Sequence, residues 1–446
     1  MCSCKKSYTA AARALGCKVS SRDADALLSA FRAAGFEIVD FSEKADVYII
    51  NTCTVTNISD KKSRQTVSRA LALNPEAVIA VAGCMSQVSP AAAAALRGVS
   101  IVAGTAGRAE IPEAALEMLR NGLPAAPVIL TRDISQARVF DEETAEQAGR
   151  TRAYLKIQDG CDNFCSYCVI PYARGRSRSR ALAAVRAEAE RLAGEGFKEI
   201  VITGIHAESY GRDLSPPLRL LDAARAVSET PGVARARLSS LSPLAVTDEF
   251  LEGLTALGNV CAHFHLSLQS GCERTLAAMD RRYSAAFYAE SARKIRGAFP
   301  GAALTTDIIT GFPGETDRDF EESFRFCESV GFAKIHVFPF SPKKGTKAYA
   351  LPGRVPASVK KERAARFLAL SEESRRRFLA GFEGRVMPVL FERRAGGFSS
   401  GLTENYIAVS VREDFPPNAI APVELTPENM TDYSNFTKRW QPKRRL

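Results

Sequence analysis

Residues 155–180 read LKIQDGCDNFCSYCVIPYARGRSRSR and place three cysteines within eight residues, directly after an apolar stretch that predicts a strand. Cys161, Cys165 and Cys168 have the spacing C-x3-C-x2-C. A structural zinc ion normally takes four protein ligands, often as two separated pairs, and no fourth cysteine or histidine lies nearby. Three thiolates suit three corners of a 4Fe-4S cube, whose fourth iron stays open to a small molecule. The spacing therefore predicts an iron–sulfur cluster that takes part in chemistry.

Four arginines follow these cysteines at alternate positions, namely Arg174, Arg176, Arg178 and Arg180. Further basic clusters lie at residues 343–347, 375–377 and 438–445. A single run of charge is usually a solvated face, but several runs beside a cysteine site favour a polyanionic partner.

The composition is that of a globular protein with two or three domains. The chain has 446 residues, of which 25% are charged and 46% hydrophobic, and its formal net charge is +10. No stretch approaches eighteen apolar residues, and the first residues lack the apolar run of a secretory signal. We therefore expect a cytoplasmic protein that does not enter a membrane. In that compartment the eleven cysteines are unsuited to disulfides and more often bind metal or react.

The order of apolar and helical stretches predicts an α/β fold in three parts. Up to about residue 130, short apolar runs alternate with helical segments, which is typical of an open parallel sheet. A polar stretch at 131–152 reads as a linker, and six further strand–helix units predict a partial (β/α)6 barrel. A helical segment follows at 360–378, and the remaining short strands, with glycine and proline turns, predict a small all-β module. We place the domains at residues 1–135, 136–376 and 377–446.

A second set of cysteines lies far apart in the amino-terminal part. Cys53 follows an apolar run that ends in INT, and Cys84 follows one that ends in VAG. Cys17 follows RALG. Parallel strands bring their carboxyl ends to one edge of a sheet, where ligands gather. One such cysteine is more often a small buried residue, but three with the same placement predict a second site.

The first cysteine motif, followed by the predicted partial barrel, resembles the radical S-adenosylmethionine superfamily. The resemblance implies that S-adenosylmethionine binds the open iron and is cleaved to a 5′-deoxyadenosyl radical. It also implies a set of residues that line the cofactor pocket: Tyr167, Gly204, Ser267, Gln269, Asp307, Gly311 and Glu315. Short strings such as SLQSG and TGF also occur as simple turns after buried strands.

ALGCKVS, INTCTVTN and AGCMSQ, around the other three cysteines, resemble the methylthiotransferase family over nearly the whole chain. The resemblance implies a second 4Fe-4S cluster held by Cys17, Cys53 and Cys84, a central radical domain and a carboxyl-terminal module of the TRAM type. INTCTVTN and CSYCVIPYARGRSRSR look most like the branch that acts on N6-threonylcarbamoyladenosine just 3′ of the tRNA anticodon (position 37). S-adenosylmethionine would serve as both radical source and methyl donor, with an external electron donor and a sulfur donor.

The partner implied by this resemblance is the anticodon loop of tRNA, with the modified base splayed out of the loop. Arg174, Arg176, Arg178 and Arg180 would hold phosphates or the threonyl carboxylate. The last residues, YSNFTKRWQPKRRL, combine basic and aromatic side chains, so Lys438, Arg439 and Trp440 are expected to contact RNA. A solvated basic tail is the alternative.

The resemblance is weakest at the front of the chain, where KKSYTAAARALGCKVSS is rich in alanine and has Ser20 in place of the usual asparagine. We assign no role to Cys2 and Cys4. The other cysteines, and all four histidines, are expected to pack in the interior: Cys261, Cys272, Cys327, His206, His263, His265 and His336.

Four other functions remain open. Sister branches of the family modify isopentenyladenosine in tRNA or an aspartate in a ribosomal protein. A non-catalytic iron–sulfur sensor that binds RNA would not need a cofactor pocket beside its cluster. An electron-transfer carrier would normally ligate each cluster with four cysteines.

Overall fold

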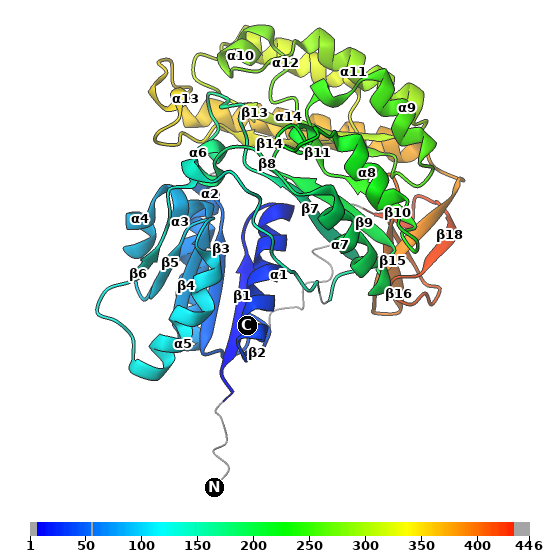
Figure 1. The fold of residues 1–446 in the computed structure, drawn as a ribbon. Helices are drawn as coiled ribbons and strands as arrows, with labels where there is room; N and C mark the ends of the chain where they lie inside the picture. Colours follow the sequence, from blue (N-terminus) through cyan, green and yellow to red (C-terminus); the bar gives the residue numbers. More distant parts are fainter. Residues whose placement is uncertain (1–6, 55–56, 148, 432–446) are drawn as a thin grey trace.

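The computed structural model describes residues 7–54, 57–147 and 149–431. Figure 1 shows three parts: an amino-terminal α/β domain in blue and cyan, a central curved sheet with helices around it, and a small sheet in orange and red. This is the α/β architecture that the sequence predicts. In the described part of the chain, no helix is long and apolar enough to span a membrane.

The amino-terminal domain is built on six parallel strands in the order β2-β1-β3-β4-β5-β6. Their bounds are β1 Thr9–Ala14, β2 Glu37–Ile38, β3 Val47–Thr52, β4 Val78–Gly83, β5 Ile101–Ala103 and β6 Val128–Leu130. Every residue of β3 and β4 is buried. Helices cover both faces of the sheet, which explains why these strands are continuous apolar runs rather than alternating ones.

The helices of this domain are α1 Lys18–Ala33, α2 Asn57–Leu73, α3 Cys84–Val88, α4 Pro90–Ala94 and α5 Ile111–Asn121, with a short 3-10 helix η1 Arg108–Glu110. α1 and α5 contribute to the core on one face of the sheet, and α2 and α4 to the core on the other. The alanine-rich stretch at the front of the chain forms β1, between β2 and β3. Ala10 packs there with Leu27 and Phe31 of α1, so its small side chain lets the helix lie close to the strand.

The central domain is a partial barrel made of two four-stranded sheets, β8-β7-β9-β10 and β11-β12-β13-β14. The strands are β7 Arg152–Asp159, β8 Arg178–Ser179, β9 Glu199–Gly204, β10 Arg235–Leu238, β11 Ser240–Leu241, β12 His263–Leu266, β13 Ala303–Thr310 and β14 Lys334–Pro339. One residue separates β10 from β11, so the second sheet continues the first. Each of the six predicted strand stretches contains a strand, and only the β7–β8 pair is antiparallel among the described pairs of these sheets.

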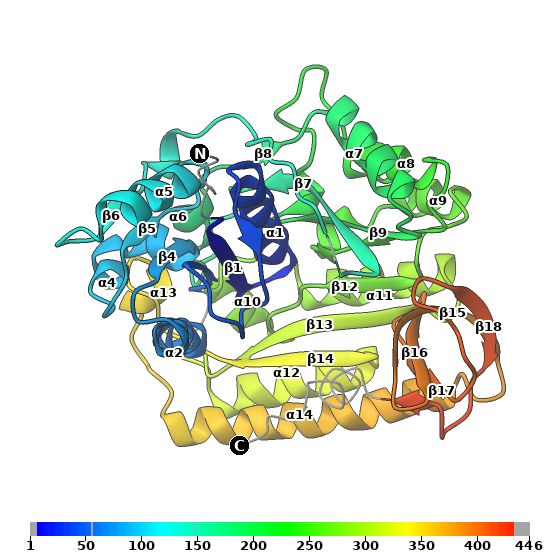
Figure 2. The same cartoon turned by 90° about the horizontal axis from the view of Figure 1, so that it is seen from below.

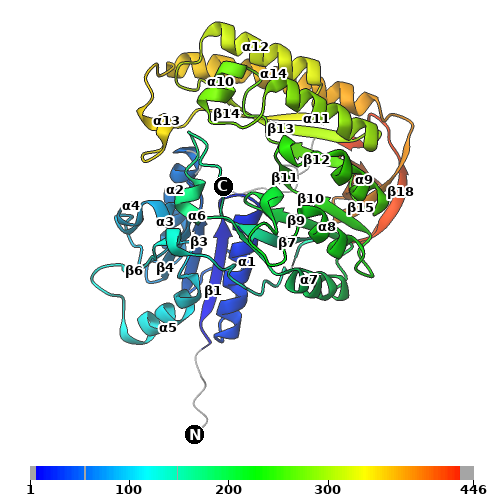
Figure 3. The same ribbon diagram turned by 45° about the horizontal axis from the view of Figure 1, so that its top comes forward.

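Helices lie along the outside of the partial barrel, as Figure 3 shows for α9, α11 and α12. They are α6 Ile170–Arg174, α7 Leu182–Gly194, α8 Leu220–Ser228, α9 Asp248–Ala256, α10 Glu273–Ala278, α11 Ala285–Ala298, α12 Asp317–Val330, α13 Lys347–Ala350 and α14 Ala357–Ala380, with the 3-10 helices η3 Ala207–Ser209 and η4 Pro243–Ala245. α14 contains the predicted charged helical segment. Figure 2 shows it running past β13 and β14 to the carboxyl-terminal module.

The carboxyl-terminal module is an antiparallel sheet in the order β18-β15-β16-β17-β19. Its strands are β15 Val386–Ala395, β16 Phe398–Thr403, β17 Ala408–Val411, β18 Ile420–Glu424 and β19 Met430–Thr431. Its core contains Phe382, just after α14, together with Val389, Phe391 and Val409. The predicted all-β module is therefore confirmed.

The polar stretch at 131–152 connects the first two domains and binds both of them. It contains the 3-10 helix η2 Ile134–Gln136, and Glu143 pairs with Arg22 of α1 at 3.3 Å. Glu142 pairs with Arg180 at 2.7 Å. The side chain of Gln147 receives the Tyr154 N–H at 2.6 Å. The linker is thus held in place by contacts with both neighbours.

Candidate active site

The first cysteine trio lies in the loop that leaves β7. Gly160 adopts φ +74°, and a Cβ there would lie 1.9 Å from the carbonyl oxygen of Arg176, so the tight turn before Cys161 requires glycine. Gln158 holds the turn, because its side-chain amide donates to the carbonyl oxygens of Asp159 and Gly160, each at 2.8 Å. Our sequence analysis did not single out Gln158, since a polar residue inside a strand carries no motif.

A cavity of about 150 Å³ opens beside this loop. Its wall combines the three cysteines with three residues predicted to line a cofactor pocket: Cys161, Cys165, Cys168, Tyr167, Ser267 and Gln269. Burial raises the pKa of Cys161 to about 11 and that of Cys168 to about 12, and the neighbouring cysteines add to both shifts. The three thiols therefore lie close enough together to influence one another.

Arg281 is a further member of this site. It also lines the 150 Å³ cavity, and its guanidinium donates to Cys165 Sγ at 3.3 Å and to the Tyr283 hydroxyl at 2.8 Å. A cationic donor on a ligand sulfur stabilises the thiolate form that iron requires. The sequence offered no signal for Arg281, because it lies 116 positions away from Cys165.

A second cavity, of about 190 Å³, continues from the first past Tyr167. Gln269 and Asp307 line it together with the apolar residues Ile309 and Phe338. The Gln269 N–H donates to the Asp307 carbonyl oxygen at 2.8 Å, which joins the ends of β12 and β13 at the pocket. A polar rim around an apolar slot suits a flat heterocycle with polar substituents, which agrees with the cofactor pocket predicted around Tyr167.

Gly311 and Glu315 lie in the turn after β13, where they contact each other and α14. The Gly311 N–H donates to Glu315 Oε1 at 2.9 Å, and Arg363 of α14 pairs with the same carboxylate at 2.6 Å. A Cβ on Gly311 would lie 2.1 Å from the side chain of Lys360. These contacts hold the turn against α14, so both residues act here through the shape of the turn.

The second cysteine trio lies at neighbouring strand ends in the amino-terminal domain. Cys17 precedes α1, Cys53 follows β3 and Cys84 begins α3 directly after β4. Since β1, β3 and β4 are adjacent in the sheet, the three thiols gather at its carboxyl edge. Burial raises the pKa of Cys84 to about 11, Arg174 opposes the rise, and Cys53 and Cys17 add to it. The three cysteines therefore lie at neighbouring strand ends, and their role as cluster ligands stays a prediction.

Neither trio is arranged around one ion: among the described residues, no three histidine, cysteine or acidic side chains form a single-ion ligand set. A 4Fe-4S cube takes each thiolate on a different iron, so its ligands stand farther apart than those of a zinc ion. Three thiols around a 150 Å³ cavity, with an arginine on one sulfur, fit that requirement.

A third and larger cavity of about 620 Å³ lies where the three domains meet. Cys17 and Lys18 line it from the amino-terminal domain, Gly204 and Asp307 from the barrel, and Tyr406 from the carboxyl-terminal module. Gly204 and Asp307 are two of the predicted cofactor residues, and Asp307 also lines the 190 Å³ cavity. The 620 Å³ cavity thus brings Cys17 of the second trio and two predicted cofactor residues to the same space.

The arginines after Cys168 lie differently from our expectation. Arg174 and Arg178 are 1% and 2% exposed, and the Arg174 guanidinium contacts Asp159 at 3.0 Å and Asp23 at 2.7 Å. Arg178 donates to the Arg174 carbonyl oxygen at 2.9 Å. Burial alone would raise the pKa of Asp159, but Arg174 and Lys156 hold it far below its usual value. Phosphate binding by Arg174 and Arg178 is therefore replaced by a structural role, since both are enclosed by protein.

Arg176 is the exposed member of the group, with 55% of its side chain accessible, and it pairs with Asp162 at 3.1 Å. It stays a predicted RNA contact. Lys438, Arg439 and Trp440 lie outside the described residues.

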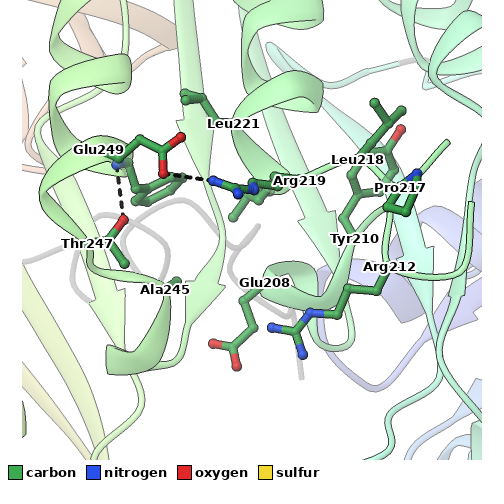
Figure 4. Close-up of a pocket in the computed structure, with 12 residues that line it drawn as sticks. Glu208, Tyr210, Arg212, Pro217, Leu218, Arg219, Leu221, Ala245, Thr247 and Glu249 are labelled. Atoms are coloured by element: carbon green, nitrogen blue, oxygen red, sulfur yellow. Dashed lines mark hydrogen bonds and ion pairs between the residues drawn. The ribbon is translucent and has the colours of Figure 1, made fainter.

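A surface hollow of about 550 Å³ adjoins the first trio's cavity, since Glu208 lines both. Figure 4 shows Glu208 and Arg212 pointing toward the same open space, while Arg219 turns to Glu249. That ion pair measures 2.7 Å and is exposed. Glu208 also accepts from the Ser242 N–H at 3.0 Å and pairs with His206 at 2.9 Å. His206 thus has a partner at the rim of the cavity, whereas we expected simple packing.

Comparison with known proteins agrees with this geometry. Residues 155–327 match the Radical SAM superfamily, and residues 9–104 match a family described as uncharacterized protein family UPF0004. Over 411 residues the chain is 40% identical to the threonylcarbamoyladenosine tRNA methylthiotransferase MtaB of Bacillus subtilis (strain 168), covering 90% of each chain. The chain belongs to the radical S-adenosylmethionine methylthiotransferase family.

Other members of this methylthiotransferase family are also similar. MtaB of Aquifex aeolicus (strain VF5) is 36% identical over 89% of this chain and 94% of its own. The tRNA-2-methylthio-N(6)-dimethylallyladenosine synthase of Bacillus subtilis (strain 168) is 33% identical over 85% of this chain and 75% of its own. Among solved structures, the radical S-adenosylmethionine methyltransferase TsrM from Kitasatospora setae has a TM-score of 0.56 at 17% identity, covering 77% of each chain, which shows a shared fold alone.

As a radical S-adenosylmethionine methylthiotransferase, the protein is an enzyme that uses a 4Fe-4S cluster and S-adenosylmethionine. Cys161, Cys165 and Cys168 supply the only C-x3-C-x2-C spacing in the sequence. The cavities beside them are lined by four of the residues predicted to bind the cofactor, namely Tyr167, Ser267, Gln269 and Asp307.

Proposed function

We propose that this methylthiotransferase adds a methylthio group to C2 of N6-threonylcarbamoyladenosine in the anticodon loop of tRNA, in the cytoplasm. The observation that carries the proposal is the 620 Å³ cavity, because Cys17 of the second trio lines it together with Gly204 and Asp307, two predicted cofactor residues. The similarity to two MtaB proteins supports the threonylcarbamoyl substrate.

Each part of the site has a role in this proposal. When bound, the cluster and S-adenosylmethionine supply a carbon-centred radical, which an unactivated aromatic carbon requires. Cys161, Cys165 and Cys168 hold the cluster, and Arg281 stabilises the thiolate of Cys165. Tyr167, Gln269 and Asp307 orient the cofactor in the slot between β12 and β13.

Cys17, Cys53 and Cys84 hold a second 4Fe-4S cluster in this proposal, with sulfur and electrons coming from external donors. Cys17 is exposed, whereas Cys84 is 5% exposed. The exposed thiol faces the 620 Å³ cavity, so this edge of the second site is the one that a splayed-out base reaches.

The reaction tests the proposal directly. Anaerobically reconstituted enzyme is given reductant, S-adenosylmethionine and tRNA that carries threonylcarbamoyladenosine. We expect 5′-deoxyadenosine and 2-methylthio product by mass spectrometry of nucleosides, and we expect Cys53→Ala to form 5′-deoxyadenosine without product. If the enzyme acted only on isopentenyladenosine tRNA, its substrate would instead be the one named for the dimethylallyladenosine synthase of Bacillus subtilis (strain 168).

Iron content tests the second cluster separately. Two cube clusters correspond to about eight irons per chain, so replacing either trio with alanine leaves about four. Cys327 is buried in the barrel core, away from both trios, and Cys327→Ala serves as the control that keeps about eight. About four irons in the unmodified protein would rule out the second cluster.

A further inference from the structure

The 620 Å³ cavity is lined by more basic than acidic side chains. Its basic residues are Lys18, Lys334 and Arg375, and among the described residues its only carboxylate is Asp307. Asp307 contacts His265 at 3.2 Å within the wall. A pocket lined by more basic than acidic side chains favours an anion.

Basic groups also lie behind one wall of this cavity. The guanidinium carbons of Arg237 and Arg152 lie 4.2 Å and 5.2 Å from the centre of the Tyr406 ring. Arg237 is paired with Glu199 at 2.6 Å and Arg152 with Glu392 at 2.5 Å. Both arginines therefore have carboxylate partners and shape the wall, whereas Lys18 lines the cavity itself.

Lys18 is the best placed of these cations. It is the first residue of α1, directly after Cys17, and its Nζ lies 6.0 Å from the centre of the Tyr406 ring. It is half-buried, and in the described parts of the chain no carboxylate pairs with its ammonium group. The first turn of α1 contains no acidic residue, so the positive end of the helix dipole adds to the charge of Lys18.

The substituents of the two candidate bases differ in charge, to which a wall that contains Lys18 responds. A threonylcarbamoyl group ends in a carboxylate and carries a hydroxyl, whereas an isopentenyl group is uncharged and apolar. Docking an apolar group here would desolvate Lys18 without a partner, which is costly. A carboxylate would form a charge-assisted hydrogen bond instead.

We propose that Lys18 binds the carboxylate of the threonylcarbamoyl group and is the main residue that selects this base over one with an uncharged substituent. The inference rests on the proposed function and names the contact that gives it specificity. It also makes a single residue next to Cys17 responsible for positioning the base at the exposed edge of the second cysteine site.

A second carboxylate has to be distinguished from the first, because S-adenosylmethionine carries one on its methionine end. Gly204 and Asp307, two predicted cofactor residues, line the same cavity as Lys18. The experiment therefore measures the affinities for tRNA and for S-adenosylmethionine in separate arms.

The test uses reconstituted enzyme and two anticodon stem-loops, one with threonylcarbamoyladenosine and one with its methyl ester, which lacks the charge. Fluorescence anisotropy gives both dissociation constants. We expect the unmodified enzyme to prefer the acid by about tenfold or more, the range for a hydrogen bond to a charged group. Lys18→Gln should bind acid and ester equally, and Lys18→Arg should restore most of the preference.

Two controls make the result specific. Lys44→Gln removes an exposed lysine of the same domain, in the loop before β3, and should keep the unmodified preference. Iron content and S-adenosylmethionine affinity of Lys18→Gln should equal those of the unmodified enzyme, which shows that the neighbouring Cys17 still holds its cluster.

The proposal would be overturned if Lys18→Gln kept the acid-to-ester ratio of the unmodified enzyme, whether or not its affinity for S-adenosylmethionine fell. It would also be overturned if Lys18→Gln lost affinity for both stem-loops equally and lost iron as well. A lack of acid preference in the unmodified enzyme would also overturn it. The methylthiolation assay decides the proposed function independently, because it scores product rather than this ratio.

Discussion

Arg174 links the amino-terminal and central domains through ion pairs. Its guanidinium contacts Asp159 of β7 and Asp23 of α1, and it lies beside Cys84. All of these groups are buried. Removing one partner of a buried ion pair leaves an uncompensated charge, which is far more destabilising than losing a pair on the surface.

We expect Arg174→Met to lower the free energy of unfolding by about 3–5 kcal/mol. Arg176→Met, two residues away, removes an exposed pair and should cost about 1 kcal/mol or less. Urea titrations of the cluster-free proteins under reducing conditions measure both values. Equal losses in the two variants would contradict the structural role of Arg174.

We expect the stability of the folded protein to depend on pH through His336. Burial lowers its pKa from 6.5 to about 4, and the neighbouring His265 adds to the shift. The unfolded chain therefore binds this proton first as pH falls. Between pH 6.5 and about 4 the histidine lowers the stability of the folded state, and below that range it adds no further loss.

Histidine NMR measures this pKa directly, because the chain has four histidines. We expect the signal that His336→Gln removes to titrate near pH 4. The same variant should show a smaller loss of stability between pH 6.5 and pH 4.5 than the unmodified protein. A signal that titrates near pH 6.5 would refute the burial argument.

Prediction from sequence located residues whose position depends on local spacing. The six cysteines are of this kind, because a motif of three cysteines and the ends of parallel strands determine where they lie, while their roles as cluster ligands stay predictions. The expectation failed for Arg174 and Arg178, because the fold encloses both: Asp23, a partner of Arg174, lies 151 positions away from it, and Arg178 donates to the Arg174 carbonyl oxygen. Lys18 and Arg281 were missed because only the fold brings them to the cavities that they line.

At the scale of elements, the long apolar strands were predictable and the short ones were not. β3 and β4 are six-residue runs buried along their whole length. β2 and β6 have two and three residues, too few for a periodic pattern, and only their neighbours in the sheet define them. The short β8 escaped prediction for the same reason, inside the basic stretch after Cys168.

β10 attaches the carboxyl-terminal module to the barrel. Arg237 donates to the Glu404 carbonyl oxygen at 2.6 Å and pairs with Glu199 at the same distance, and Arg235 donates to the Leu402 carbonyl oxygen at 3.1 Å. The module therefore depends on two arginines of a four-residue strand for much of its polar contact with the barrel.

We expect Arg237→Met to lower the free energy of unfolding by about 3–5 kcal/mol, because Glu199 stays buried without its closest cation. The module should also become more sensitive to limited proteolysis after α14. Arg225→Met is the matched control, since its pair with Glu229 lies on the surface of α8. Unchanged proteolysis in Arg237→Met would show that apolar packing alone holds the module.

At the scale of the whole molecule, we expect RNA binding to depend on charges that are far apart in the sequence. The net charge is +10, and residues 438–446, outside the described part, contain Lys438, Arg439 and three further cations. Truncation after residue 437 should weaken tRNA binding. It should also flatten the plot of log affinity against log salt by about 0.7–0.9 per lost phosphate contact.

S-adenosylmethionine cleavage without tRNA is the control for this truncation, because none of the predicted cofactor residues belongs to residues 438–446. Filter binding at several salt concentrations gives the slope. An unaltered slope would show that the tail is only solvated charge and would assign RNA binding to Arg176 and the module.

The 620 Å³ cavity belongs to no single domain, since its wall includes Gly16 near one end of the chain and Ile407 near the other. A chimera could take its first domain from a relative with another substrate. The residue at position 18 would then come from the relative, whereas Tyr406 on the opposite wall would come from this protein. Such hybrids should fold yet discriminate poorly between bases. Substrate choice in this lineage is therefore expected to change by coordinated point substitutions across all three parts, rather than by shuffling of whole domains.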